Sequence, residues 1–234
     1  MLRPIANAFL SLTHIKQDTL NNKKVAIIGG TGFIGNFILE QFTEASKIVA
    51  FTRKPLENCP ATVENVLVDF SNWDLIKDKL KGVEVVFSCM GTTFKQVKGD
   101  LKLYHWVDVE IPFEFAKIAK ELGVKHLLLV SSVGTSPNAK GYYLKMKWEL
   151  EEAISKLDFE SFSIFRPSLL MGNRKEFRLM ERIFQGLMGA LAFLIPGSYK
   201  PILGKEVAKA MIQQSLKQGI GQQILEYKEI KALL

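Results

Sequence analysis

The stretch that decides the fold is VAIIGGTGFIGNF, residues 25–37. Its first four residues are apolar and include β-branched valine and isoleucine, a composition typical of a strand buried on both faces. Gly29, Gly32 and Gly35 follow at intervals of three, and apolar residues then recur at helical spacing. The stretch therefore predicts a strand, a tight glycine turn and a helix.

Glycines at this spacing between a strand and a helix are typical of a dinucleotide site. The first permits a tight turn, the second lets the backbone approach a pyrophosphate, and the third lets the helix pack on the strand. A glycine-rich turn without a ligand is the alternative, because the motif alone is weak. The expected cofactor contacts in this turn are Gly29, Thr31, Gly32, Phe33, Ile34 and Gly35.

Composition narrows the class of protein. The 234 residues are 47% hydrophobic and carry a net charge of +7, a size and composition that suit one α/β domain. The basic residues are scattered among acids, so we expect a solvated surface and no nucleic-acid partner. The two cysteines, Cys59 and Cys89, have no metal-ligand spacing, so we expect no metal and a reducing compartment.

Residues 1–23 precede the first strand and predict a helical extension, because four apolar residues from Leu2 to Leu12 form a helical stripe. No acid occurs before Asp18, a feature shared with mitochondrial presequences. We expect a cytoplasmic protein, with the mitochondrial matrix as the alternative. The longest apolar stretch, residues 183–196, is too short to span a bilayer, so we expect no transmembrane segment.

Further along the chain, short apolar runs alternate with helical patterns. This alternation predicts βαβ units, and hence an α/β fold with a Rossmann-like, doubly wound parallel sheet. We interpret residues 24–234 as one domain, with a small C-terminal lobe on the substrate side from about residue 169. The remaining strands are expected at 47–51, 63–68, 83–88, 126–132 and 161–167, with helices over about 101–122 and 142–156.

The loop after the second strand indicates which nucleotide is bound. No acid lies between Glu44 and Glu57, and Arg53 and Lys54 stand where an NAD site carries the acid that binds the ribose. Two cations suit a 2′-phosphate, so we expect NADP(H) to be preferred over NAD(H). Two solvated loop charges are the alternative.

The end of the third strand offers further candidate contacts to the nucleotide. Asp69 stands there and could meet the adenine, and Phe70 follows it. A plain turn residue is the alternative for Asp69.

The segment after the fifth strand carries the candidate chemistry. Tyr143 and Lys147 are four residues apart and share one helical face, and Ser132 closes the preceding strand. A lysine cation 5 to 6 Å from a phenol supplies about 3 of the roughly 4 kcal/mol needed to ionise it near pH 7. The three residues therefore favour proton transfer to or from a substrate oxygen. A half-buried tyrosine and a surface lysine are the alternative.

In combination, these motifs resemble the short-chain dehydrogenase/reductase superfamily: GGTGFIG at 29–35, Ser132, and Tyr143 with Lys147. More narrowly, the chain is similar to the atypical NAD(P)-binding subfamily of the Tat-interactive-protein oxidoreductases. That similarity rests on CMGTT (89–93), WVDVE (106–110), SSVG (131–134), YLKMK (143–147) and FRPSLLMGNR (165–174).

The resemblance implies a role for each matching residue. Tyr143 would protonate a carbonyl, Lys147 would hold the nicotinamide ribose and ease ionisation of the phenol, and Ser132 would orient the substrate oxygen. The superfamily's fourth catalytic member, an asparagine, has no clear counterpart, and Asp108 is the nearest candidate. The resemblance also implies that the nicotinamide is lined by Met90, Gly91 and Thr92 and closed over by Arg166, Pro167 and Ser168.

The leading hypothesis is therefore an NADP(H)-dependent oxidoreductase of a small carbonyl or alcohol. The alternative is an NADP(H)-binding regulatory or assembly protein with little turnover, because fold alone does not determine function. The sequence identifies neither the substrate nor the oligomeric state.

Overall fold

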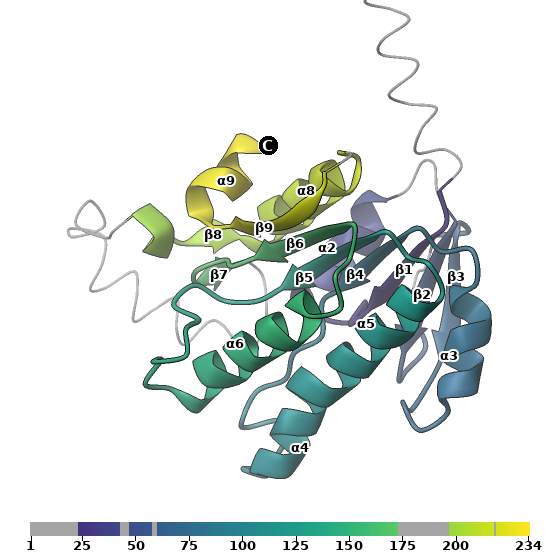
Figure 1. Cartoon of the computed structure of the whole chain (residues 1–234), viewed down its shortest axis with the longest axis horizontal. Helices are drawn as coiled ribbons and strands as arrows, with labels where there is room; N and C mark the ends of the chain where they lie inside the picture. The colour runs from purple at the N-terminus through teal and green to yellow at the C-terminus, as the bar shows by residue number, and fades with distance from the viewer. Residues whose placement is uncertain (1–22, 43–46, 58–59, 173–196, 218) are drawn as a thin grey trace, which may run out of the picture.

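A computed structural model describes residues 23–42, 47–57, 60–172, 197–217 and 219–234 (Figure 1). Seven strands form one parallel sheet in the spatial order β3-β2-β1-β4-β5-β6-β9. The first strand, β1, lies inside the sheet. β2 and β3 are added on one side of it and β4, β5 and β6 on the other, so the expected doubly wound parallel sheet is confirmed. The strands are β1 (Val25–Ile28), β2 (Ile48–Thr52), β3 (Val63–Leu67), β4 (Val85–Ser88), β5 (His126–Val130), β6 (Ser161–Phe165) and β9 (Gly221–Leu225).

Helices cover both faces of this sheet (Figure 1). One face carries α3 (Trp73–Leu80), α4 (Leu101–His105), α5 (Ile111–Glu121) and α6 (Tyr142–Ser155). The other face carries α2 (Phe33–Gln41), α8 (Gly204–Ser215) and α9 (Tyr227–Ala232). Because both faces are covered, the central strands are mainly apolar and buried, as the run before the glycines indicates for β1.

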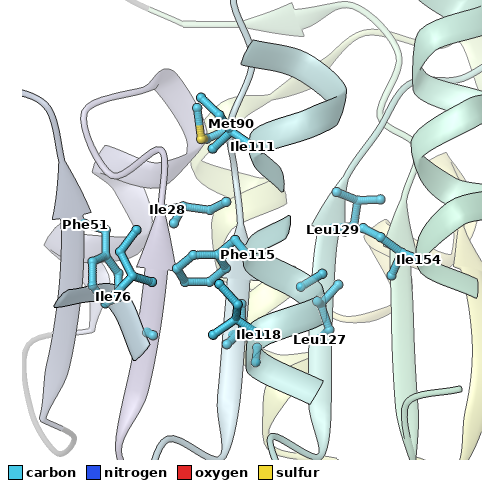
Figure 2. Packing of buried hydrophobic residues seen from close by; sticks show 14 of the residues in the cluster. Ile28, Phe51, Ile76, Met90, Ile111, Phe115, Ile118, Leu127, Leu129 and Ile154 are labelled. Carbon is cyan, nitrogen blue, oxygen red and sulfur yellow. The ribbon is translucent and has the colours of Figure 1, made fainter. Parts of the chain in front are cut away.

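Apolar side chains fill the two interfaces between helices and sheet. Figure 2 shows Phe115 of α5 near Ile28 of β1 and Phe51 of β2. The rings of Phe51 and Phe115 meet edge to face, with centroids 5.4 Å apart. Such a pair contributes about 0.5–1.5 kcal/mol beyond the burial of its area. This packing holds the strand ends in place, and the loops that follow them form the site.

The helix expected over 101–122 is interrupted. A π-helical turn, Trp106–Glu110, separates α4 from α5, and the amide of Ile111 donates to the carbonyl of Trp106, five residues earlier. The cause is local: Pro112 has no N–H to donate, and in an ideal α-helix its ring would clash with the carbonyl of Asp108. The wider turn removes that clash and places Asp108 inside the protein, fully buried.

Two expected parts of the chain fall largely outside the described residues. The N-terminal extension does so up to residue 22, and the C-terminal lobe does so over residues 173–196, so both stay predictions. What is described of the lobe is a small parallel sheet of β7 (Leu170–Met171) and β8 (Ile202–Leu203), with a 3-10 turn at Gly197–Tyr199. None of the helices in the described part of the chain has the length and apolarity needed to cross a bilayer.

Candidate active site

A cavity of about 610 Å³ lies along the carboxyl edge of the sheet. Its walls come from the segments that follow β1 to β5, together with the start of α6. Because these strands are neighbours, the cavity extends across the sheet from Arg53 and Phe70 at one end to Tyr143 and Lys147 at the other. Open α/β sheets bind their ligands at this position, where the order of the strands reverses.

The glycine turn forms the middle of the cavity wall. Gly29 has φ +79°, and a β-carbon there would lie 2.5 Å from the carbonyl of Cys89 on the neighbouring strand. A β-carbon on Gly35 would lie 2.2 Å from the carbonyl oxygen of Gly29, so this residue allows α2 to pack against the turn. Both roles match the sequence prediction. The sequence predicts that six residues of the turn contact the cofactor. Five of them line the cavity, namely Gly29, Thr31, Gly32, Phe33 and Ile34, whereas Gly35 does not.

Phe33 also connects the glycine turn to the C-terminal part of the chain. β-Carbons placed on Gly172, after β7, and on Gly204, after β8, would each lie 2.5 Å from its ring. The ring therefore fills the space that these two glycines leave open. The sequence gives no sign of this contact, because the three residues are far apart along the chain.

The loop after β2 carries the two predicted cations. Both side chains are exposed to solvent, but only Arg53 lines the cavity. The loop is held by buried Thr52, whose hydroxyl donates to the carbonyl of Lys54 over 2.7 Å and accepts from Asn65 Nδ2 over 2.7 Å. These bonds set the backbone of the turn that presents Arg53.

Of the two candidates after β3, Phe70 reaches the cavity and Asp69 does not. Phe70 has φ +63° and is buried against Trp73, with ring centroids 6.1 Å apart. Asp69 Oδ1 accepts hydrogen bonds from the hydroxyl and the backbone amide of Ser71, and these bonds lower the pKa of Asp69. In this structure Asp69 has the geometry of a turn residue.

Tyr143 and Lys147 come together as their spacing predicts. Both line the cavity, and Lys147 Nζ lies 5.8 Å from the centre of the Tyr143 ring. The Tyr143 side chain is partly exposed, whereas Lys147 is only 3% exposed and donates to the carbonyl of Met90 over 3.4 Å. An accessible phenol beside a buried cation is an arrangement suited to proton transfer.

The serine that faces the cavity is Ser131, one residue before the predicted Ser132. Ser132 Oγ donates to the carbonyl of Val133 over 3.3 Å and does not line the cavity. Ser131 lines it, is buried, and its Oγ has no hydrogen-bond partner among the described residues. Neighbouring residues of an extended chain point to opposite sides, so only one of the two can face inward. The letters SS do not indicate which.

The loop after β4 lines the cavity as the resemblance implies, with Met90, Gly91 and Thr92 all on its wall. The amide of Thr92 donates to Asp108 Oδ2 over 2.8 Å. Cys89 begins this loop, and burial raises the pKa of its thiol well above the ordinary value. This shift favours the thiol over the thiolate.

The segment expected to close over the nicotinamide makes other contacts in this structure. Arg166 Nε and Nη2 both donate to the carboxylate of buried Glu151 on α6. The carbonyl of Pro167 accepts from the amide of Val133, and Ser168 Oγ donates to the carbonyl of Lys200. None of the three lines the described cavity, so their part in closing the site stays a prediction. No cluster of metal-binding side chains occurs among the residues that the structure covers.

Comparisons with known proteins agree with this geometry. Residues 29–182 match the family model described as NAD(P)H-binding. Protein HTATIP2 of Rattus norvegicus is 31% identical over 232 residues, which cover 96% of this chain and 93% of that protein. Protein FMP52, mitochondrial, of Debaryomyces hansenii is 34% identical over 205 residues, which cover 83% of this chain and 90% of that protein.

Among solved structures, MoeE5 in complex with UDP-glucose and NAD superposes with a TM-score of 0.67 at 16% identity, covering 89% of this chain and 80% of that one. At this identity the likeness shows the fold alone. The family model spans residues 29–182, a range that contains Ser132, Tyr143 and Lys147, and the alignments with the two relatives cover most of the chain. The chain belongs to the NAD(P)H-binding family, in the atypical short-chain dehydrogenase/reductase branch that contains HTATIP2 and FMP52.

Proposed function

We propose that this protein is an NADP(H)-dependent oxidoreductase that reduces a carbonyl, or oxidises the matching alcohol, of a small-molecule substrate. The observation that carries the proposal is the shared cavity: the glycine turn lies in its middle and the accessible phenol of Tyr143, beside the buried ammonium of Lys147, lies at one end. A proton donor is therefore held next to the place where a nicotinamide ring would lie.

The residues present fit a dinucleotide. Gly29, Thr31 and Gly32 line the cavity, and α2 begins directly after Gly32 on the cavity wall. The N-terminal end of a helix favours an anionic pyrophosphate, because its dipole and its first backbone amides point toward the anion. The cavity volume of about 610 Å³ also lies within the roughly 300–1,000 Å³ common for ligand sites.

The preference for NADP(H) rests on Arg53. Its side chain lines the cavity at the end where the adenosine half would lie, and no carboxylate pairs with it in the described part of the chain. A guanidinium suits a phosphate because it can donate two parallel hydrogen bonds. Lys54 follows it in the same turn and does not line the cavity, so it would add charge near the phosphate rather than a contact inside the cavity.

The cofactor, when bound, supplies or accepts a hydride, and the chain handles the proton. In the reducing direction, the phenol of Tyr143 donates its proton to the substrate oxygen. The ammonium of Lys147 stabilises the phenolate that remains, because an opposite charge at this distance is worth about 3 kcal/mol in a partly solvated site. A serine hydroxyl holds the substrate oxygen. The family resemblance assigns this role to Ser132, but Ser131 is the serine that lines the cavity.

A screen of aldehydes and ketones, followed by loss of NADPH absorbance, tests the activity. Turnover of at least one class of carbonyl with NADPH is the expected result. Calorimetry run beside the screen separates the alternatives. Tight NADPH binding without turnover of any carbonyl would favour a nucleotide-binding regulatory or assembly protein, and failure to bind either nucleotide would contradict both.

The compartment is a separate proposal. We propose the cytoplasm as the location, with the mitochondrial matrix as the alternative; the relative FMP52 is named a mitochondrial protein, which favours that organelle. Fractionation of cells that express the full chain with a C-terminal tag decides between them.

A further inference from the structure

The deepest charge in the site belongs to Asp108. Its side chain is fully buried on the π-helical turn between α4 and α5. Oδ2 accepts the amide of Thr92 over 2.8 Å, and Oδ1 lies 3.4 Å from Lys147 Nζ. That ion pair is 3% exposed on the lysine side and 0% on the aspartate side, so both charges are removed from water together.

The geometry leaves each charge dependent on the other. Apart from the contact to Lys147, Asp108 Oδ1 has no hydrogen-bond partner among the described residues. Lys147 Nζ has the carbonyl of Met90 as its hydrogen-bond acceptor, at a long 3.4 Å. A backbone carbonyl does not neutralise an ammonium, and a buried charge without a counter-charge is strongly disfavoured.

The same carboxylate also connects two walls of the cavity. Thr92 belongs to the loop after β4, and Lys147 belongs to α6, so one side chain fixes both. Gly91 packs directly over the pair: a β-carbon there would lie 3.6 Å from Asp108 Oδ1 and 3.9 Å from Lys147 Nζ. The π turn makes this possible, because it places Asp108 inward at the level of the loop.

We propose that Asp108 is the positioning residue of this site: its buried carboxylate is the counter-charge that fixes the Lys147 ammonium in place and holds the 90–92 loop against it. Lys147 then presents a fixed ammonium to the ring of Tyr143 and to the cavity. The catalytic use of this pair rests on the proposed function, in which the Lys147 ammonium assists proton transfer by Tyr143. The test of the pair itself needs no nucleotide.

Other ionisable groups face this pair and limit what one substitution can do. Cys89 faces Lys147 from the end of β4, and Tyr143 faces it from α6. Tyr104 on α4 faces Asp108, and burial raises the pKa of Tyr104 to about 12. Glu151, one helical turn after Lys147, is held by Arg166. Burial disfavours the ionised forms of Cys89 and Tyr104, so neither replaces the charge of Asp108. A phenol ionises in the pH range where a lysine titrates, so the phenolate of Tyr143 has to be removed from the test.

The test is an NMR titration of the nucleotide-free protein. The Cε–Hε signal of Lys147, assigned with Lys147→Met, is followed against pH in Tyr143→Phe with and without Asp108→Asn, so that no phenolate forms beside the ammonium. The asparagine keeps an oxygen for the amide of Thr92 and removes only the charge. We expect the Lys147 signal to titrate at a pH lower by about one unit or more in Asp108→Asn, because the buried cation has lost its partner. An unchanged midpoint would overturn the proposal.

Glu149→Gln is the matched control. It makes the same carboxylate-to-amide change on α6, where Glu149 pairs with His105 at the surface, and it should leave the Lys147 titration unchanged. A purely structural effect of losing a carboxylate would move both variants alike.

The double variant Asp108→Asn/Lys147→Met keeps the proposal testable if Asp108→Asn alone folds poorly. It removes both charges, so it should melt at a higher temperature than Asp108→Asn. A double variant that melts no higher would contradict the pairing. Because all these measurements use the protein without nucleotide, a failure of NADPH to bind would overturn the proposed function and leave this inference standing.

Discussion

One helical turn separates Tyr143 from Lys147 on α6, and the ammonium of Lys147 lies 5.8 Å from the centre of the Tyr143 ring. The tyrosine side chain is accessible from the cavity while the lysine is buried beneath it. The two side chains can therefore have different roles. The phenol can contact a substrate, and the ammonium can stabilise the phenolate while it is shielded from bulk water.

Lys147→Met should damage both binding and turnover. A single charge at about this distance is worth about 3 kcal/mol, and the substitution also leaves buried Asp108 without its partner, so turnover should fall roughly a hundredfold or more. The affinity for NADPH should fall as well, because Lys147 lines the cavity. Steady-state kinetics and calorimetry measure the two effects. Lys145→Met changes an exposed lysine of the same helix and should do neither. Equal effects of the two substitutions would contradict the assignment.

Arg53→Ala should narrow the preference for NADPH. A hydrogen bond to a charged group is worth about 1.5–3 kcal/mol, so the affinity for NADPH should fall tenfold or more. The affinity for NADH, which has no 2′-phosphate, is the internal control and should stay nearly unchanged. Lys54→Ala should have a smaller effect, because Lys54 does not line the cavity. Equal affinities of the unmutated protein for the two nucleotides would refute the NADP(H) preference.

Gly35→Ala should destabilise the fold around the glycine turn. The added β-carbon would lie 2.2 Å from the Gly29 carbonyl oxygen, a clash with backbone that cannot rotate away. Overpacking typically costs about 1–3 kcal/mol, and a backbone clash belongs at the upper end. Urea denaturation measures the change. Gly141→Ala is the control, because a β-carbon there meets nothing within 4 Å and φ is −98°. An equal loss in the free energy of unfolding for the two substitutions would contradict the close packing of α2 on the turn at Gly35.

Much of the fold could be predicted from local patterns. The apolar run, the glycine spacing and the helix that follows are properties of neighbouring residues, and they identify β1, the turn and α2. The spacing of Tyr143 and Lys147 is equally local, since it depends only on the helical repeat. β9 is different: it is an edge strand with four exposed residues out of five, GQQIL, and it lacks the apolar pattern of the central strands.

What the sequence could not indicate depends on contacts between distant segments. The pairing of Asp108 with Lys147 needs a π turn, and the periodicity of residues 101–122 is the same with or without one. Pro112 is the only local sign of it. Which of Ser131 and Ser132 faces the cavity depends on where β5 ends, and the engagement of Arg166 with Glu151 depends on how β6 packs against α6.

His126 should make stability depend on pH. It is buried at the start of β5, with Nε2 3.0 Å from Ser163 Oγ. Burial, with a smaller contribution from Lys23, lowers the pKa of His126 to about 4 from 6.5. The unfolded chain therefore binds more protons between these values, so stability is full above about pH 6.5 and falls as the pH drops toward 4.

The full effect of His126 is about 3 kcal/mol, from a shift of roughly 2.5 pH units. Denaturation of the parent and of His126→Gln at pH 7 and at pH 4.5 measures it. The glutamine variant should lose less stability between the two pH values, because its amide does not titrate. An equal loss in both proteins would assign the acid sensitivity to other groups.

Turnover by Tyr143→Phe is the measurement that tests the central claim most directly. The substitution removes only the phenolic oxygen, so the affinity for NADPH should stay nearly unchanged while turnover of a carbonyl falls by roughly 10²–10⁴, the usual range for loss of a general acid. Tyr142→Phe is the matched control, because the neighbouring phenol donates to the carbonyl of Leu101 and does not line the cavity. The account predicts normal turnover for Tyr142→Phe and a collapse for Tyr143→Phe, and a carbonyl reduced at the same rate by both variants would contradict it.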